Sequence, residues 1–409
     1  MNKTSNSTKS TVAIIGPDTL PIPPFRGGGI QTCVWETVSH FRKYRATVYS
    51  GLPEENIKEV PLREEHSENI FIKIPRNDLR SHLIRVSHLQ FNNYFPYVYQ
   101  IAHDINRNRP EIVHVHSRCW FLPYLNILLK YRPKYILQHH NHYFEDMTEK
   151  QVNSFMRMID AFIGVSNYTC KTEVLNRFPE YTEKVHVIHN GVNLEKYRPK
   201  WACASESILK IKSEYNIQES EKIILFVGRV VNGKGVEPLI LAFQKIADKY
   251  PGWKMMIVGS SWFGETIKDE FLLRLKKISE PIKEKILFTG FVPNENLPAI
   301  YSIADIFSAP SIMEEPFGLV FVEAMASGLP VIASERGGIP DVVVQGQTGF
   351  LAANPDDPAE IAEILQLMIS GTEKSFEFGR AGRKRVEQFF SWQEAADKTE
   401  DLYDKVLGK

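Results

Sequence analysis

The 409-residue sequence predicts an α/β protein made of two doubly wound, Rossmann-like domains that face each other. Three observations support this: short apolar runs alternate with helical patterns, the runs show little polar alternation, and a second series begins near residue 205. Strands buried on both faces of a parallel sheet have such continuous apolar runs. The length suits two or three domains of about 100–200 residues each. Because open parallel sheets bind ligands outside the carboxyl ends of their strands, we expect the site in the interdomain cleft.

In the first series, strands are expected where β-branched and other apolar residues run together, and helices where apolar residues recur at helical spacing. The expected strands are 12–16, 46–51, 70–74, 112–116, 135–140, 161–166 and 184–191. The expected helices are 30–43, 94–108, 120–130, 149–158 and 167–177. This order predicts βαβ units and a parallel sheet.

The second series repeats the pattern. Its expected strands are 223–229, 254–260, 285–291, 306–310, 330–334 and 348–352, and its helices are 236–250, 264–278, 296–303, 317–327, 358–370 and 373–389. Residues 197–207 are expected to form a hinge, and residues 391–408 a last helix. We therefore expect a disordered tail (1–10), an N-terminal domain (11–196), a C-terminal domain (205–388) and a terminal helical segment (389–409).

Composition narrows the class of protein. Lys plus Arg number 49, as do Asp plus Glu, so no global field gathers nucleic acid, and no nucleic-acid partner is expected. The 43% hydrophobic and 24% charged residues exclude a disordered or coiled-coil chain. Four cysteines without a CxxC pair suit a reducing compartment. No signal-like leader and no apolar run of roughly 18 residues are evident, so we expect a soluble, cytoplasmic protein.

The block PSIMEEPFGLVFVEAMASGLPVIAS (310–334) carries two carboxylates eight residues apart, Glu315 and Glu323. If a helix starts near Phe317, eight helical residues rise about 12 Å, so both carboxylates can border one elongated ligand that carries a sugar at each end. The free N–H groups of Phe317, Gly318 and Leu319 would point at that ligand. The spacing alone also suits a helix-start charge and a surface residue.

Two further loops follow predicted strands. GRVVNGKG (228–235) places Arg229 and Lys234 at a strand's carboxyl end, where they can stabilise a departing anion, although a basic surface turn has the same composition. PIPPFRGGGIQ (21–31) puts glycines before a helix, as a phosphate cradle or as a hairpin without ligand contact.

Histidines gather in the first domain, at His114, His116 and in QHHNH (138–142). A His-x-His pair on a strand puts both rings on one face of the sheet. No carboxylate or cysteine stands at a spacing that completes a metal site, so a core histidine is the expected role of His116.

With its flanks, block 310–334 resembles the signature of retaining GT-B glycosyltransferases of the large glycosyl transferases group 1 type family. Segments 187–199, 289–307 and 335–343 are also similar to that family, so the resemblance covers nearly the full chain. IVGSSWFGE (257–265) lacks the family's usual Gly-x-Gly. With LPIPPFRGGGIQ, this departure resembles bacterial spore-coat-associated members.

The resemblance implies a role for each candidate residue. Glu315 would hold donor-hexose hydroxyls, and Glu323 the ribose hydroxyls. The N–H groups of Phe317, Gly318 and Leu319 would contact sugar or phosphate, and Phe291 and Val292 would pack the nucleobase. Arg229 and Lys234 would stabilise the leaving diphosphate without a metal, Gly28 and Gly29 would admit diphosphate and acceptor, and His140 would lie near the donor sugar's outer hydroxyls. The last helix would pack back on the N-terminal domain.

The resemblance thus implies a retaining, metal-independent transfer of a hexose from a nucleoside diphosphate sugar, with UDP favoured, to a hydroxyl acceptor. No cofactor is expected. The alternatives are a non-catalytic scaffold or coat protein, and an epimerase or hydrolase on the same fold. The basic, aromatic stretch 76–100 suits either a peripheral contact with a lipid-linked or glycan acceptor or a solvated helix face followed by core aromatics.

Overall fold

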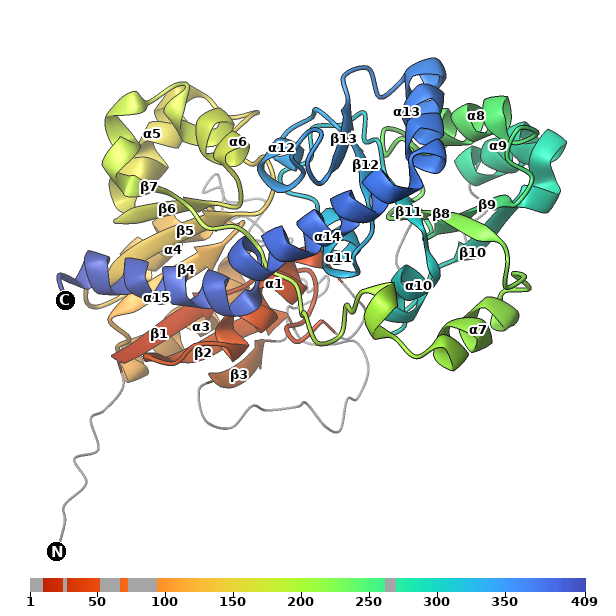
Figure 1. The fold of residues 1–409 in the computed structure, drawn as a ribbon. Coiled ribbons are helices and arrows are strands. Elements are labelled where there is room, and N and C mark those ends of the chain that lie inside the picture. The colour runs from red at the N-terminus through yellow and green to blue at the C-terminus, as the bar shows by residue number, and fades with distance from the viewer. Residues whose placement is uncertain (1–9, 25–27, 52–66, 73–93, 262–269) are drawn as a thin grey trace, which may run out of the picture. The chain divides into compact units, whose positions relative to one another are not determined.

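The computed structural model describes residues 10–24, 28–51, 67–72, 94–261 and 270–409 (Figure 1). These residues divide into two compact units. Unit 1 comprises Met1–Ile188 and Trp392–Lys409, and unit 2 comprises His189–Ser391. The expected tail (apart from residue 10) and most of stretch 76–100 lie outside the described residues.

Unit 1 is a parallel α/β fold. Its described strands are β1 (Ser10–Ile15), β2 (Tyr44–Gly51), β3 (Ser67–Ile72), β4 (Ile112–His116), β5 (Lys134–His139), β6 (Ala161–Gly164) and β7 (Val185–Val187). Its described helices are α1 (Gly29–Ser39), α3 (Phe95–Asn108), α4 (Phe121–Leu128), α5 (Glu149–Met158), α6 (Asn167–Cys170), the π-helical turn η1 (Lys171–Leu175), the 3₁₀ turn η2 (Pro179–Lys184) and α15 (Trp392–Leu407). Within the described residues, seven parallel strands follow the order β3-β2-β1-β4-β5-β6-β7.

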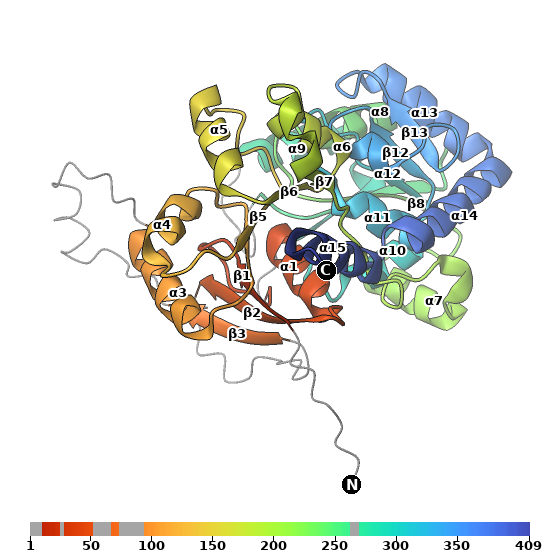
Figure 2. The same ribbon diagram turned by 90° about the vertical axis from the view of Figure 1, so that its left-hand side faces the viewer.

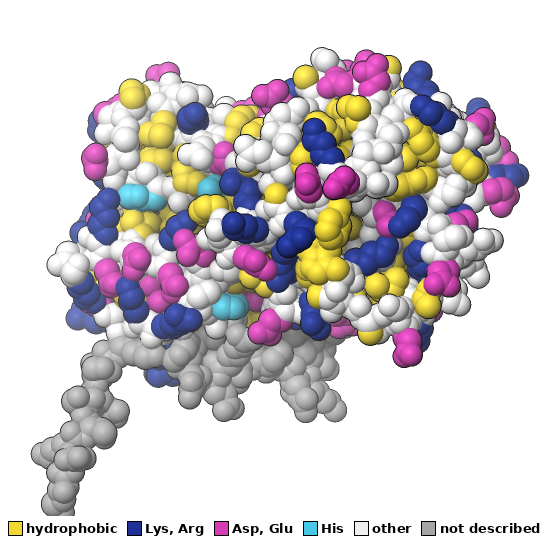
Figure 3. All heavy atoms as spheres, viewed as in Figure 1, with side chains coloured by type: hydrophobic (Ala, Val, Ile, Leu, Met, Phe, Trp, Pro, Cys, Tyr) yellow, Lys and Arg dark blue, Asp and Glu magenta, His cyan; other side chains and the backbone are white. Residues whose placement is uncertain are grey.

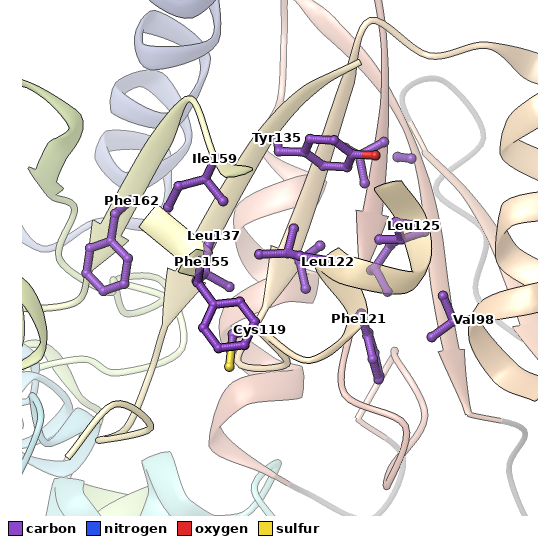
Figure 4. Close-up of a cluster of buried hydrophobic side chains, with 14 of the residues drawn as sticks. Val98, Cys119, Phe121, Leu122, Leu125, Tyr135, Leu137, Phe155, Ile159 and Phe162 are labelled. Atoms are coloured by element: carbon purple, nitrogen blue, oxygen red, sulfur yellow. The ribbon is translucent and has the colours of Figure 1, made fainter. Parts of the chain in front are cut away.

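Alternate side chains of the central strands point to opposite faces of the sheet. Val113 and Val115 of β4 belong to a buried cluster with residues of α3, α4 and α5, including Val98, Leu125 and Phe155 (Figure 4). His114, between the two valines, instead contacts Tyr403 of α15. The period of two in a strand explains why helices cover both faces of this sheet.

The terminal helix α15 packs against α1 within unit 1 (Figure 2). One carboxylate oxygen of Glu400 accepts hydrogen bonds from three successive backbone N–H groups, those of residues 42–44, at 2.8–3.0 Å. Tyr403 is fully buried, with its ring edge-on to Phe41 and Tyr44. A buried carboxylate oxygen that accepts three backbone hydrogen bonds and a buried aromatic ring fix this helix on the unit.

Unit 2 repeats the architecture. Its described strands are β8 (Lys222–Val227), β9 (Trp253–Val258), β10 (Ile286–Gly290), β11 (Ile306–Ser308), β12 (Val331–Ser334) and β13 (Gly349–Ala352). Its described helices are α7 (Ser205–Glu214), α8 (Val236–Ile246), α9 (Glu270–Ser279), α10 (Leu297–Ile303), α11 (Leu319–Ala326), α12 (Ile339–Val342), α13 (Pro358–Ser370) and α14 (Thr372–Phe389), with 3₁₀ turns η3 (Lys200–Ala202) and η4 (Glu280–Lys285). Its described strands follow the order β10-β9-β8-β11-β12-β13, and all are parallel.

One expectation about the helices needs correction. The stretch 197–207 contains η3 and the start of α7, and no helix was expected at 205–214. The two compact units divide between Ile188 and His189, and the N–H of Val192 bonds to the carbonyl of Phe390 within unit 2.

Within the described residues, no helix is long and apolar enough to cross a membrane. On the face shown in Figure 3, Lys and Arg side chains are interspersed with Asp and Glu, as the equal counts of the two charges predict.

Candidate functional site

Both sheets reverse their strand order once, and several candidate residues follow strands at these reversals. In unit 2 the order changes direction between β8 and β11. The loop 228–235 follows β8, and the loop with Glu315 follows β11. Ligands of doubly wound sheets bind outside the carboxyl ends of strands at such a switch point. The topology therefore brings together two blocks that are about 80 residues apart in the chain.

Backbone contacts hold these two loops together. The carbonyl of Gly233 accepts hydrogen bonds from the N–H groups of Ile312 (2.8 Å) and Met313 (3.1 Å). Gly235 has φ 79°, and a Cβ there would collide with the carbonyl of Pro310. Glycine is required at this close approach. The result is that Lys234 lies directly opposite the loop that carries Glu315.

Lys234 and Glu315 form an ion pair through Nζ and Oε1. Their side chains are 20% and 15% exposed, so both remain accessible to a ligand. The hydroxyl of buried Ser311 lies 3.2 Å from the same carboxylate oxygen. Arg229 is exposed, and no partner for its guanidinium is found among the described residues. This edge of the sheet therefore presents two cations and one carboxylate.

Helix α11 begins two residues later than the sequence indicated. Gly318 caps it with φ 85°, a left-handed conformation that the helix cannot include. Phe317 is buried. The backbone N–H groups of Phe317, Gly318 and Leu319 have no hydrogen-bond acceptor among the described residues. Since Glu315 precedes the helix, the helical rise does not give its separation from Glu323. The free donors remain at the helix N-terminus, close in sequence to Glu315.

Glu323 is partly buried on α11 and accepts a hydrogen bond from Tyr301 Oη at Oε2, at 2.9 Å. Burial raises the pKa of Glu323 to about 7, although hydrogen bonds from Tyr301 and Tyr197 act in the opposite direction. The sequence reading missed both tyrosines, because they lie on other elements. A carboxyl group that titrates near neutrality and is held by buried partners is a candidate for ligand binding.

Phe291 and Val292 follow β10, on the same carboxyl edge of the unit 2 sheet as Arg229. Phe291 is 40% exposed, so its ring is accessible to a ligand. A small cavity of about 180 Å³ borders Gly233 and Gly235, and its lining includes none of Lys234, Glu315 and Glu323.

In unit 1 the corresponding reversal lies between β1 and β4. Gly28 caps α1 with φ 114°, and Gly29 starts that helix. His140 directly follows β5, and its Nε2 lies 3.0 Å from Nδ1 of His116 at the end of β4. The glycine loop and His140 thus lie at carboxyl strand ends of one sheet.

The histidines of unit 1 form a buried chain. The rings of His114 and His116 stack at 4.2 Å, as the alternation of a strand predicts, and His114 Nδ1 lies 2.8 Å from Tyr403 Oη. Burial lowers the pKa of His114 and of His140 to about 3 and that of His116 well below its usual value. All three rings are therefore neutral at physiological pH.

The sequence offered no carboxylate at a spacing that would complete a metal site with the histidines, but the structure brings Glu173 of η1 to His139, with Oε2 2.6 Å from Nδ1. Glu173 is buried together with its helical neighbours Cys170 and Val174. A charged residue among apolar positions of a predicted helix was the feature of the sequence that could have indicated a buried partner. Among the described residues, no group of three or more His, Cys, Asp or Glu side chains could hold a metal ion.

Comparison with known proteins agrees with this geometry. Residues 207–385 match the family model of glycosyl transferases group 1, and residues 27–196 match that of glycosyltransferase family 4. Spore coat protein SA of Bacillus subtilis (strain 168) is 29% identical over 401 residues, covering 96% of this chain and 99% of that protein. Alpha-maltose-1-phosphate synthase of Mycolicibacterium smegmatis is 31% identical over 253 residues, covering 60% and 63%.

Solved structures share the fold. A glycosyltransferase from Rickettsia africae ESF-5 superposes with a TM-score of 0.78 at 23% identity, over 98% of this chain and 99% of that one. Anabaena Alr3699/HepE in complex with UDP and glucose gives 0.73 at 19% identity, over 96% and 99%. The fold predicted from the sequence is confirmed.

Proposed function

We propose that this chain, which is a glycosyltransferase of the group 1 type with the GT-B fold, transfers a hexose from a UDP-sugar to a hydroxyl acceptor with retention of configuration and without a metal ion. The observation that carries the proposal is the pairing of Lys234 with Glu315 beside the free N–H groups at the start of α11. These groups supply the cation, the hydroxyl acceptor and the amide donors that a sugar diphosphate requires.

In this reaction the bond between the anomeric carbon and the diphosphate oxygen breaks, and the diphosphate keeps the electron pair. The acceptor oxygen bonds to the anomeric carbon from the same face, and its proton passes to the departing diphosphate oxygen. Negative charge develops on the diphosphate, and Lys234 and Arg229 would stabilise it. We assign Glu315 and His140 to the donor hexose, and Gly28 and Gly29 to the approach of diphosphate and acceptor.

The remaining donor contacts would come from unit 2. We assign Glu323 to the ribose hydroxyls, and Phe291 and Val292 to the nucleobase. The choice of UDP is supported by Alr3699/HepE, which was solved with UDP and glucose and also with UDP-glucose. We also propose a cytoplasmic or coat-associated place, of which the coat-associated alternative is supported by the likeness to spore coat protein SA.

Nucleotide binding tests this proposal directly. UDP at 100 times its dissociation constant should stabilise the protein by about 2.7 kcal/mol in a thermal melt, and ADP, GDP and dTDP at the same concentration should stabilise it less. Glu323→Ala should lose most of the UDP effect. Absence of any nucleotide effect would favour the scaffold alternative, and release of free sugar without acceptor would favour a hydrolase.

Removal of metal ions tests the proposed metal independence. Transfer activity should persist unchanged in excess EDTA, because Lys234 and Arg229 supply the positive charge that a divalent ion provides in other transferases. Initial rates with and without EDTA, and after adding Mg²⁺ or Mn²⁺ back, measure this. A loss in EDTA that either ion restores would contradict the proposal.

A further inference from the structure

The loop that follows β5 is held by a buried carboxylate from a different element. Glu173 lies on η1 and is only 1% exposed. Its Oε2 accepts hydrogen bonds from the backbone N–H groups of Tyr143 (3.0 Å) and Phe144 (2.9 Å) and lies 2.6 Å from His139 Nδ1. Its other oxygen, Oε1, lies 3.8 Å from His142 Nδ1. One side chain thus contacts the loop on both sides of His140.

The same carboxylate is ionised at neutral pH. Burial acts to raise the pKa of Glu173, but the hydrogen bond from His139, the nearby ring of His142 and the hydrogen bond from the N–H of Phe144 outweigh it and lower the pKa to about 2. Charge-assisted hydrogen bonds are roughly twice as strong as neutral ones, and they fix the geometry of their donors. The loop backbone is therefore held by an anion rather than by neutral contacts.

A second side chain, from the turn that follows η1, supports the loop further along. The guanidinium of Arg177 donates to the carbonyls of Phe144 (2.8 Å) and Met147 (3.0 Å). Loop amides therefore bond to Glu173, and loop carbonyls bond to Arg177. A loop held by both its donors and its acceptors has little freedom to rearrange.

His140 lies in the part of the loop that Glu173 holds. Its Nε2 is 3.0 Å from His116 Nδ1, whereas its Nδ1 is buried and has no hydrogen-bond partner among the described residues. A buried, unpartnered ring nitrogen is costly unless a ligand group completes it. Its position depends on residue 139 before it and residue 143 after it, and both are bound to Glu173.

We propose that Glu173 is a positioning residue for the transfer reaction, which sets the orientation of His140 toward the donor sugar by holding the loop 139–144. This rests on the proposed function, in which His140 contacts that sugar. Glu173 itself touches no substrate, and it acts only through the loop.

The test is Glu173→Gln, which keeps the shape and one acceptor oxygen but removes the negative charge that strengthens the hydrogen bonds from Tyr143 and Phe144. We expect kcat to fall about 10- to 100-fold, since small misplacements of reacting groups have effects of that size. The dissociation constant of UDP should stay within about twofold, because Glu323, Phe291 and Val292 are all in unit 2. Tyr181→Phe, which removes a side-chain hydrogen bond elsewhere in unit 1, is the matched control and should leave kcat unchanged.

A double-mutant cycle separates positioning from general destabilisation. If Glu173 acts through His140, Glu173→Gln should have little further effect on kcat in a His140→Ala background. Equal losses in both backgrounds would overturn the proposal. If Glu173→Gln does not fold, Arg177→Gln removes the other half of the loop support and takes its place in the cycle.

NMR of the histidine rings tests the positioning role of Glu173 independently of the proposed function. The ring signals of His140 should shift in Glu173→Gln and not in Tyr181→Phe, and unchanged signals would overturn the positioning role. If His140→Ala retains full activity, the assignment of His140 to the donor sugar is wrong, whereas the NMR result still decides whether Glu173 orients that ring.

Discussion

Replacing Lys234 with alanine should lower kcat about 100- to 1,000-fold, the usual cost of removing one group that stabilises transition-state charge. The cause is the position of its ammonium group, which pairs with Glu315 at the carboxyl edge of the unit 2 sheet. In the proposed reaction it would stabilise the charge that develops on the leaving diphosphate. Steady-state kinetics with UDP-glucose and a hydroxyl acceptor measure the effect, and Lys234→Arg should retain part of the activity because it keeps the charge.

Lys283→Ala is the matched control for this prediction. Lys283 belongs to unit 2, is 61% exposed and pairs with Glu280, so its loss removes one surface cation without touching the site. Its kcat should match that of the wild type. A Lys234→Ala enzyme with near-normal kcat would contradict the assignment of this lysine to the diphosphate.

The affinity for UDP-glucose should rise about tenfold between pH 6 and pH 8, because in the proposed site only the ionised carboxylate of Glu323 would accept both ribose hydroxyls. The pKa of Glu323 is raised to about 7 by burial, so the group is mostly protonated at pH 6 and mostly ionised at pH 8. UDP-glucose is the appropriate ligand since its diphosphate does not titrate in this range. Calorimetry at both pH values measures the change.

Glu323→Gln should bind weakly and with no pH dependence, whereas Tyr301→Phe should move the midpoint to higher pH because it removes a hydrogen bond that lowers the pKa. A flat wild-type profile would contradict the role of Glu323.

Because the folded pKa lies above the ordinary 4.5, protonated Glu323 favours folding. That contribution is complete below pH 4.5 and is lost as the pH rises through about 7, so Glu323→Gln should lose less thermal stability than the wild type over this range.

The strands were the most predictable part of the fold. Continuous apolar runs locate β4 and β8 to within a residue or two, since a strand buried on both faces needs apolar residues at every position. Helix ends were less predictable. The start of α11 is set by the left-handed backbone of Gly318, and a composition pattern does not show which glycine takes that conformation. The helix α7 was not expected, because its apolar spacing begins directly after residues whose composition is typical of a loop.

The α/β class, the repetition of the strand series and the candidate residues Arg229, Lys234, Glu315 and Glu323 could be predicted from the sequence, because these depend on local composition and on motifs within single loops. The contacts between residues that are far apart in the chain could be found only in the folded structure. It paired Lys234 with Glu315, Glu323 with Tyr301, and His139 with Glu173 across 34 residues of sequence. The physical reason is that hydrogen bonds and ion pairs form between neighbours in space, and in a doubly wound sheet the strand order rather than the chain order makes the neighbours.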